Sequence, residues 1–205
     1  MGRGPKPAKS KVGAKRSISP KPPKSDGAKV RDLEKRLVEA QEQQTATSEI
    51  LRVISESPTD VRPVFEVIAA HACRLCDGVF ANVIRFDGTL MHNMAVNGFT
   101  AEAREILRRA FPSPPSRSSM SGRAILAATV VYVEDVTHDM EPGVSREMGG
   151  RTGHRAMVSV PMLHNGTPVG AITVAPLAAG RFAGRQVNLL KTFADQAAIA
   201  IENVR

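Results

Sequence analysis

The amino-acid sequence predicts an α+β fold, in which a central antiparallel β-sheet is flanked by helices and preceded by a long N-terminal helix. Two observations support this prediction. Short hydrophobic segments are joined by turn sequences such as Asp87-Gly88 and His164-Asn165-Gly166, which favour hairpins and antiparallel pairing. Segments with apolar residues at helical spacing stand before, between and after these strands. The length of 205 residues allows one ordinary domain with appendages.

Residues 1–29 are rich in Lys, Pro, Gly and Ser. They include nine Lys or Arg residues and one acidic residue, whereas residues 30–205 contain 19 of each sign, so the net charge of +8 belongs to the first segment. With so few apolar side chains to bury, we expect this segment to be a disordered basic tail. Two roles stay open: a solubilising tail, or electrostatic contact with a polyanion such as nucleic acid or anionic lipid.

Residues 30–57 are predicted to form a connector helix that Ser57-Pro58 ends. Along it, a seam of mostly apolar residues recurs at alternating spacings of three and four, the heptad pattern of a coiled coil. The seam consists of Val30, Leu33, Leu37, Ala40, Gln44, Thr47, Leu51 and Ile54. Because the seam is narrow, it favours a parallel homodimeric coiled coil, and the alternative is an amphipathic helix docked on its own domain.

The domain proper is predicted to span residues 58–205 and to begin with a helix capped by Thr59 or Asp60 and ended by Asp77-Gly78. In chain order, the next elements are strands at 79–86 and 89–96, a polar helix at 101–110, a helical turn at 121–127 and a strand at 130–133. Residues 137–153 are the least regular part, so we expect a loop with one helical turn there.

Two further strands, at residues 155–162 and 168–175, are expected to pair across the Asn165-Gly166 turn. In the second of these strands, large side chains alternate with small or polar ones. This alternation predicts one face that packs on helices and a second face with free space beside its small side chains. Gly170 allows close approach of another backbone. A final helix at residues 184–205 repeats apolar residues at helical spacing and is predicted to extend past the domain as a signalling helix.

Cys73 and Cys76 are the only cysteines, so the sequence contains no disulfide framework, as is typical of a reducing cytosol. The N-terminus has no apolar segment of the kind found in secretory signals, and we expect a cytoplasmic protein. His71 lies near both cysteines in sequence, but on a helix His71 and Cys73 would point about 200° apart and could not share an ion. We therefore expect two buried thiols rather than a metal site, with a redox pair as the alternative.

The C-terminal part of the chain resembles GAF domains. The resemblance lies in Val160-Pro161-Met162, residues 166–172 (GTPVGAI), Arg181-Phe182 and residues 189–203 (LLKTFADQAAIAIEN), and is extended by Ser121-Gly122-Arg123-Ala124 and residues 133–136 (VEDV). Residues 43–55 (QQTATSEILRVIS) are similar to the helix that precedes GAF domains in bacterial multidomain sensor histidine kinases. The resemblance implies a PAS-related sheet with the terminal helices on one side and a ligand cavity on the other.

The resemblance does not identify the ligand or any cofactor. GAF domains that bind cyclic nucleotides carry an acidic pair after a phenylalanine, and here Phe182 is followed by Ala183-Gly184. Bilin-binding relatives and the methionine sulfoxide reductases of the family need cysteines near the pocket, whereas Cys73 and Cys76 fall on the first helix of the domain. The sequence therefore disfavours these three activities.

Five residues on the less apolar side of the strands and the adjoining turn are the candidate ligand-binding residues. They are Asn82, Ser121, Met157, Ser159 and Thr173. The alternative is that they fill a ligand-free core, because periodicity does not reveal a void. Arg123 and Arg155 are expected either to face an anion or to be solvated.

Sequence motifs of nucleotide hydrolases, serine hydrolases and zinc proteases are missing, as are the phosphoacceptor helices and ATP-binding domain of a histidine kinase. We therefore expect a non-catalytic sensory domain that forms a homodimer and signals through a partner such as a histidine kinase. The alternative is a dimeric scaffold with a ligand-free core, whose basic tail binds nucleic acid or another polyanion.

Overall fold

The computed structural model describes residues 1–2, 4, 26–57, 59–141 and 143–204. Most of the predicted basic tail lies outside the described residues. By its internal contacts the chain divides into two compact units, Met1–Leu37 and Val38–Arg205. Helix α1 spans Asp26–Glu56, so it begins four residues before the predicted start at Val30.

A five-stranded antiparallel sheet forms the centre of the second unit and confirms the predicted fold class. The strands are β1 (Gly78–Phe86), β2 (Met91–Asn97), β3 (Val131–Val133), β4 (Met157–His164) and β5 (Thr167–Pro176), in the spatial order β2-β1-β5-β4-β3. Asn165 and Gly166 both have positive φ, at 49° and 79°, as expected for the tight turn between β4 and β5. The predicted central strand, β5, pairs with both β1 and β4.

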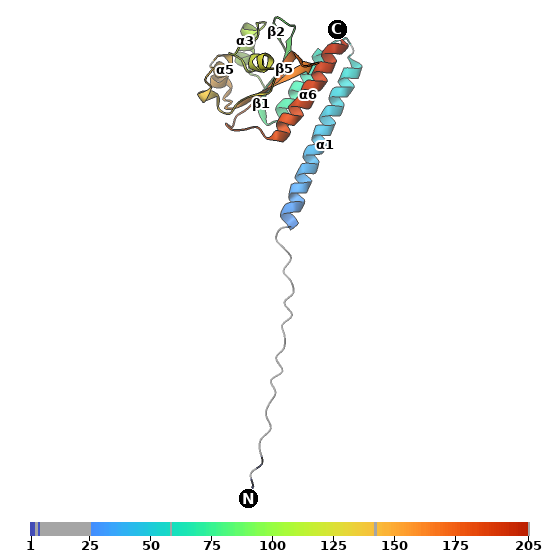
Figure 1. The fold of residues 1–205 in the computed structure, drawn as a ribbon, viewed down its shortest axis with the longest axis vertical. Helices are drawn as coiled ribbons and strands as arrows, with labels where there is room; N and C mark the ends of the chain where they lie inside the picture. Colours follow the sequence, from blue (N-terminus) through green and yellow to red (C-terminus); the bar gives the residue numbers. More distant parts are fainter. Residues whose placement is uncertain (3, 5–25, 58, 142, 205) are drawn as a thin grey trace. The chain divides into compact units, whose positions relative to one another are not determined.

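One face of the sheet is covered by α2 (Arg62–Leu75) and α6 (Gly184–Asn203), as Figure 1 shows for α6. The large residues of β5, Ile172 and Val174, belong to the same buried cluster as Leu190 and Phe193 of α6. The predicted cap of α2 was wrong: Val61 stands at the N-cap position, and the Asp60 carboxylate accepts a hydrogen bond from the Arg62 amide at 3.0 Å.

The second half of α1 packs on this same layer through a face that overlaps the predicted seam only in part, at Ile54. Ala46 and Ile50 are fully buried and Val53 packs against the cluster, whereas Leu51, a residue of the seam, is 47% exposed. Between Ala46 and Ile54 the helix is thus docked on its own domain, the arrangement we considered as the alternative. Pairing of α1 with a second chain stays a prediction.

The other face of the sheet is covered by α3 (Ala101–Ala110), α4 (Met120–Ala127), a short 3₁₀ helix η1 (Val136–His138) and α5 (Val144–Thr152). The prediction of a loop with one turn over residues 137–153 was wrong, because α5 is a helix of nine residues. Gly149 and Gly150 give this segment poor intrinsic helix propensity, and burial of Ser145 and Met148 against the domain compensates for it.

Gly170 lies where two strands leave no room for a side chain. A Cβ atom there would stand 2.2 Å from the Ile84 carbonyl oxygen and 2.0 Å from the Met162 Cε atom. The prediction of a close backbone approach at this glycine is therefore confirmed.

Candidate functional site

A small cavity of about 30 Å³ lies between the sheet and the helices α3, α4 and α5. Four of the five sequence-predicted site residues line it: Asn82, Ser121, Met157 and Thr173. The fifth, Ser159, is fully buried next to the cavity and bonds to Thr173. Sequence reasoning missed the remaining lining residues, which are Phe80, Phe99, Leu107, Phe111, Ser119, Met120, Val144, Ser145 and Met148.

Three of the candidate residues form one row across the central strands. Asn82 of β1 stands opposite Thr173 of β5, which in turn stands opposite Ser159 of β4. Directly opposed residues of antiparallel strands point to the same face of a sheet, so all three side chains lie on the cavity side. The Thr173 hydroxyl is 2.9 Å from the Ser159 hydroxyl and 3.0 Å from that of Ser121, which α4 contributes. These two hydrogen bonds use two of the three O–H donors, so one hydroxyl of the group keeps a donor that this row does not use.

Asn82 stands at the β1 end of this row, and its side-chain amide has no hydrogen-bond partner among the described residues. The residue is 5% exposed and lines the cavity, and its side-chain amide makes no hydrogen bond to another described residue. A buried amide without partners costs free energy unless water or a ligand satisfies it. Asn82 is therefore a polar group of the cavity that is available to a ligand, and the buried Ser145 also brings a hydroxyl to the lining.

Apart from Ser119 and Ser145, the rest of the cavity wall is apolar and contains several flexible side chains. The ring of Phe80 lies 4.4 Å from that of Phe99, and Met120, Met148 and Met157 complete the lining. Methionine side chains are unbranched and adapt their shape to their surroundings.

His154, which sequence reasoning also missed, packs against the ring of Phe80. Its ring meets that of Phe80 edge-on at 4.9 Å, and its Nδ1 atom lies 2.6 Å from the Thr152 hydroxyl. Burial lowers the pKa of His154 to about 4, although the nearby Ser145 backbone partly opposes this effect. The imidazole is therefore neutral at physiological pH and adds no charge to the site.

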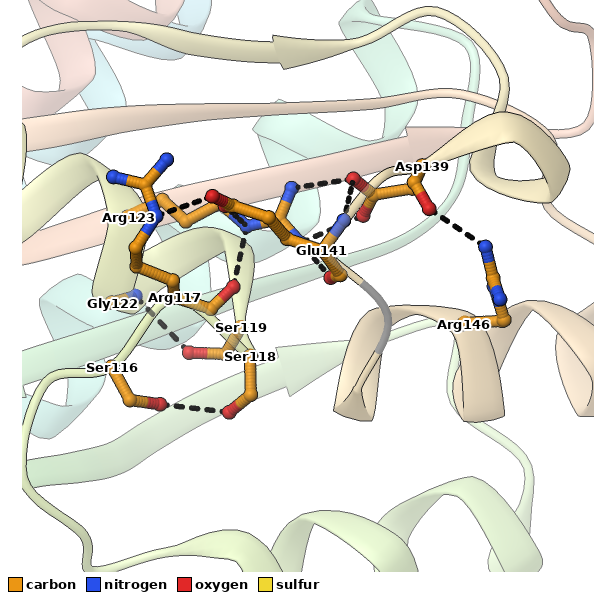
Figure 2. A network of polar contacts seen from close by, with 9 residues as sticks. All are labelled: Ser116, Arg117, Ser118, Ser119, Gly122, Arg123, Asp139, Glu141 and Arg146. Carbon is orange, nitrogen blue, oxygen red and sulfur yellow. Dashed lines mark hydrogen bonds and ion pairs between the residues drawn. The ribbon is translucent and has the colours of Figure 1, made fainter.

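A network of polar contacts joins the segments before α4 and α5 (Figure 2). The first residues of these two helices line the cavity, and we call the two segments the rim of the cavity. Arg123 of α4 is 7% exposed and donates two hydrogen bonds to the Asp139 carboxylate, at 3.0 and 2.7 Å. It also bonds to the carbonyl oxygens of Arg117 and Glu141. Arg146 of α5 donates to the Asp139 carbonyl at 2.7 Å. Arg123 thus joins the segment before α4 to the segment before α5.

This network changes the interpretation of the two candidate arginines. Arg123 is neither solvated nor free to hold an anion, because Asp139 and Glu141 already neutralise it. Burial raises the pKa of Asp139, but the hydrogen bonds from Arg123 and from the Glu141 backbone outweigh it and hold the value below the ordinary range. Arg155 is paired with Asp135 on the surface, at 2.5 and 3.2 Å.

Both cysteines lie on the opposite face of the sheet from the cavity, in the cluster that α2 and α6 form. Burial is the main cause that raises the pKa of both thiols, to about 12 for Cys76. Such thiols are poor nucleophiles at neutral pH. His71 instead lies 2.8 Å from the Glu49 carboxylate, and no group of three metal-binding side chains occurs among the described residues.

The chain matches the family model of the GAF domain over residues 58–202. No curated protein gives a significant sequence match. Within the part of the chain that the structure describes, no helix is both long and apolar enough to cross a membrane.

Solved structures share the fold at low sequence identity. The GAF domain of a phosphoenolpyruvate-protein phosphotransferase from Coxiella burnetii is 13% identical, with a TM-score of 0.65 over 80% of this chain and 94% of that one. The free methionine-R-sulfoxide reductase of Neisseria meningitidis is 15% identical, with a TM-score of 0.63 over 80% and 90%. A domain described as part of a two-component sensor histidine kinase protein from Sinorhizobium meliloti is 18% identical, with a TM-score of 0.57 over 72% and 94%.

Proposed function

The chain belongs to the GAF domain family, and we propose that it is a non-catalytic sensory domain of a cytoplasmic signalling pathway. In this proposal, the cavity beneath α3, α4 and α5 binds a small molecule, and the helices α1 and α6 transmit its occupancy to a partner. A histidine kinase is the partner that we favour, because one of the similar folds comes from such a protein.

The observation that carries the proposal is the free amide of Asn82 in a mostly apolar cavity. Ligand sites are concave and apolar, with a few polar groups that orient the ligand. The Asn82 amide and the row of hydroxyls at Ser121, Ser159 and Thr173 match that description.

The two faces of β5 offer a physical route from the cavity to the helices. Thr173 faces the cavity, whereas its neighbours Ile172 and Val174 pack in the cluster that contains Leu190 and Phe193 of α6. A ligand that displaces β5 by a fraction of an ångström therefore changes the packing of α6. For this to be a signal, the ligand must bind one of two states more tightly than the other.

Dimerisation through the terminal helices is part of the proposal. Leu33 and Leu37 in α1 are 60% and 59% exposed, and Ile199 in α6 is 50% exposed. Exposed apolar residues at heptad spacing favour association with a second helix.

The absence of catalysis in this proposal is supported by the position of the thiols. Cys73 and Cys76 lie on the face of the sheet away from the cavity, with raised pKa values. A redox role predicts that the Cys73→Ser/Cys76→Ser variant loses any reductase activity that the natural chain shows. We expect no methionine sulfoxide reductase activity in either protein.

A scaffold whose basic tail binds a polyanion is the second candidate function. It is favoured by the charge of residues 1–29, with nine basic residues and one acidic residue, and by the small volume of the cavity.

Native mass spectrometry of the full chain tests the sensory proposal. We expect a dimer whose mass exceeds that of two chains by one or two small ligands. A chain without any bound small molecule that binds DNA at moderate salt, and loses the DNA when residues 1–29 are deleted, would establish the scaffold instead.

A further inference from the structure

We propose that the ligand of this cavity is an uncharged, largely apolar molecule about the size of one aromatic ring, with one group that hydrogen-bonds to Asn82. This inference rests on the proposed function, and it specifies the chemical class of the ligand.

The first argument is the charge of the site. Among the described residues that line the cavity, none is ionisable. Arg123, the arginine of α4, is already neutralised by Asp139 and Glu141. The imidazole behind Phe80, that of His154, is neutral at physiological pH. A carboxylate, phosphate or ammonium group would therefore lose its hydration without gaining a counter-charge, and this is strongly unfavourable.

The second argument is the chemistry of the wall. Phe80, Phe99 and Phe111 present aromatic surface, while Met120, Met148 and Met157 surround the remainder. Aromatic rings pack favourably against both phenylalanine rings and methionine sulfur. The wall is thus suited to a flat apolar molecule.

The third argument is the number of free hydrogen-bonding groups. The hydroxyls of Ser121, Ser159 and Thr173 are joined by two hydrogen bonds, which use two of their three O–H donors. The Asn82 amide is the largest polar group of the lining, and it offers two N–H donors and a carbonyl acceptor that no described residue uses. One amide group on the ligand can both accept from the Asn82 N–H and donate to its carbonyl oxygen.

Binding requires the cavity to expand. Its volume of about 30 Å³ corresponds to one water molecule, whereas a dry cavity of roughly 150 Å³ accommodates benzene. The additional space is available from rotation of the methionine side chains and from displacement of α5, whose middle contains Gly149 and Gly150. The proposal therefore requires a second arrangement of α5 and the methionine side chains, with a larger cavity.

Benzamide, benzoate and benzamidine test the proposal, because they share one shape and differ in charge. We would measure their dissociation constants for the full chain at pH 7 by ligand-observed NMR and by thermal shift. We expect benzamide to bind at least tenfold more tightly than either charged analogue. The Met148→Ala variant should bind benzamide several-fold more tightly, because it starts from a larger cavity.

The role of Asn82 is tested by Asn82→Leu, which retains the branched arrangement of heavy atoms and removes the hydrogen bond. We expect a loss of about tenfold in benzamide affinity. The matched control is Asn188→Leu, at an exposed position of α6, which should leave binding unchanged.

The outcomes separate this inference from the proposed function. Equal or tighter binding of benzoate or benzamidine would overturn the chemical class and leave a sensory domain. Failure of benzamide to bind both the natural chain and Met148→Ala would also overturn the inference. The proposed function is decided separately, by whether native mass spectrometry detects a small molecule bound to the chain.

Discussion

The ion pair between Arg123 and Asp139 gives the most direct test of how the rim of the cavity is held. Both side chains are 7% exposed, and two hydrogen bonds of 3.0 and 2.7 Å join them. Replacing Arg123 by Met retains most of the packing but leaves the Asp139 carboxylate buried without its counter-charge. Removing one partner of a buried pair typically destabilises a protein by about 3–5 kcal/mol.

Urea unfolding of the full chain at pH 7 measures this loss. With a slope of about 2 kcal/mol per molar urea, a loss of about 3 kcal/mol lowers the midpoint by roughly 1.5 M. The matched control is Arg181→Met, because Arg181 is 86% exposed and pairs with Glu134 at 2.8 Å on the surface. An exposed pair of this kind contributes about 0–1 kcal/mol.

A double-mutant cycle separates the ion pair from the packing of the arginine side chain. We expect Arg123→Met/Asp139→Leu to be more stable than Arg123→Met alone, because no unpaired charge remains buried. If Arg123→Met costs no more than Arg181→Met, or if the double variant is the least stable of all, the rim is not held by this pair and the reasoning fails.

Two further predictions concern stability. The pKa of His154 is about 4 in the folded chain against 6.5 in the unfolded one, so the unfolded state binds the proton more readily. The free energy of unfolding should therefore fall by about 3 kcal/mol as pH falls from 6.5 to 4; a His154→Gln variant with an equally steep decline would refute this. Gly170→Ala should lower the urea midpoint by the equivalent of about 1–3 kcal/mol, because its Cβ meets the Ile84 carbonyl. An unchanged midpoint would show that β1 and β5 separate easily.

The row of candidate residues could be predicted because it depends on a local property of the chain. Side chains alternate between the two faces of a strand, so the small and polar residues of β5 had to lie on the face away from Ile172 and Val174. The hairpin at Asn165-Gly166 follows equally locally, from the positive φ values that these residue types tolerate.

The docking of α1 shows that the apolar pattern of a helix does not determine which surface the helix packs against. Its apolar residues support two faces, and the sequence does not say which face meets a surface of the same domain. Packing of Ala46 and Ile50 on the α2 and α6 layer decided this for the second half of the helix. Similarly, α5 forms from a glycine-containing segment because burial of Met148 outweighs its weak propensity.

By itself, then, the sequence determined the antiparallel sheet, its helices and the polar row at Asn82, Ser159 and Thr173, all of which follow from local periodicity and turn chemistry. Only the tertiary structure decided that the cavity is small and that Arg123 is neutralised by Asp139, 16 residues away. The sequence also did not predict that His154 packs against Phe80 and that burial keeps its imidazole neutral. The physical reason is that volume, desolvation and ion pairing depend on which distant segments meet, and periodicity carries no information about that.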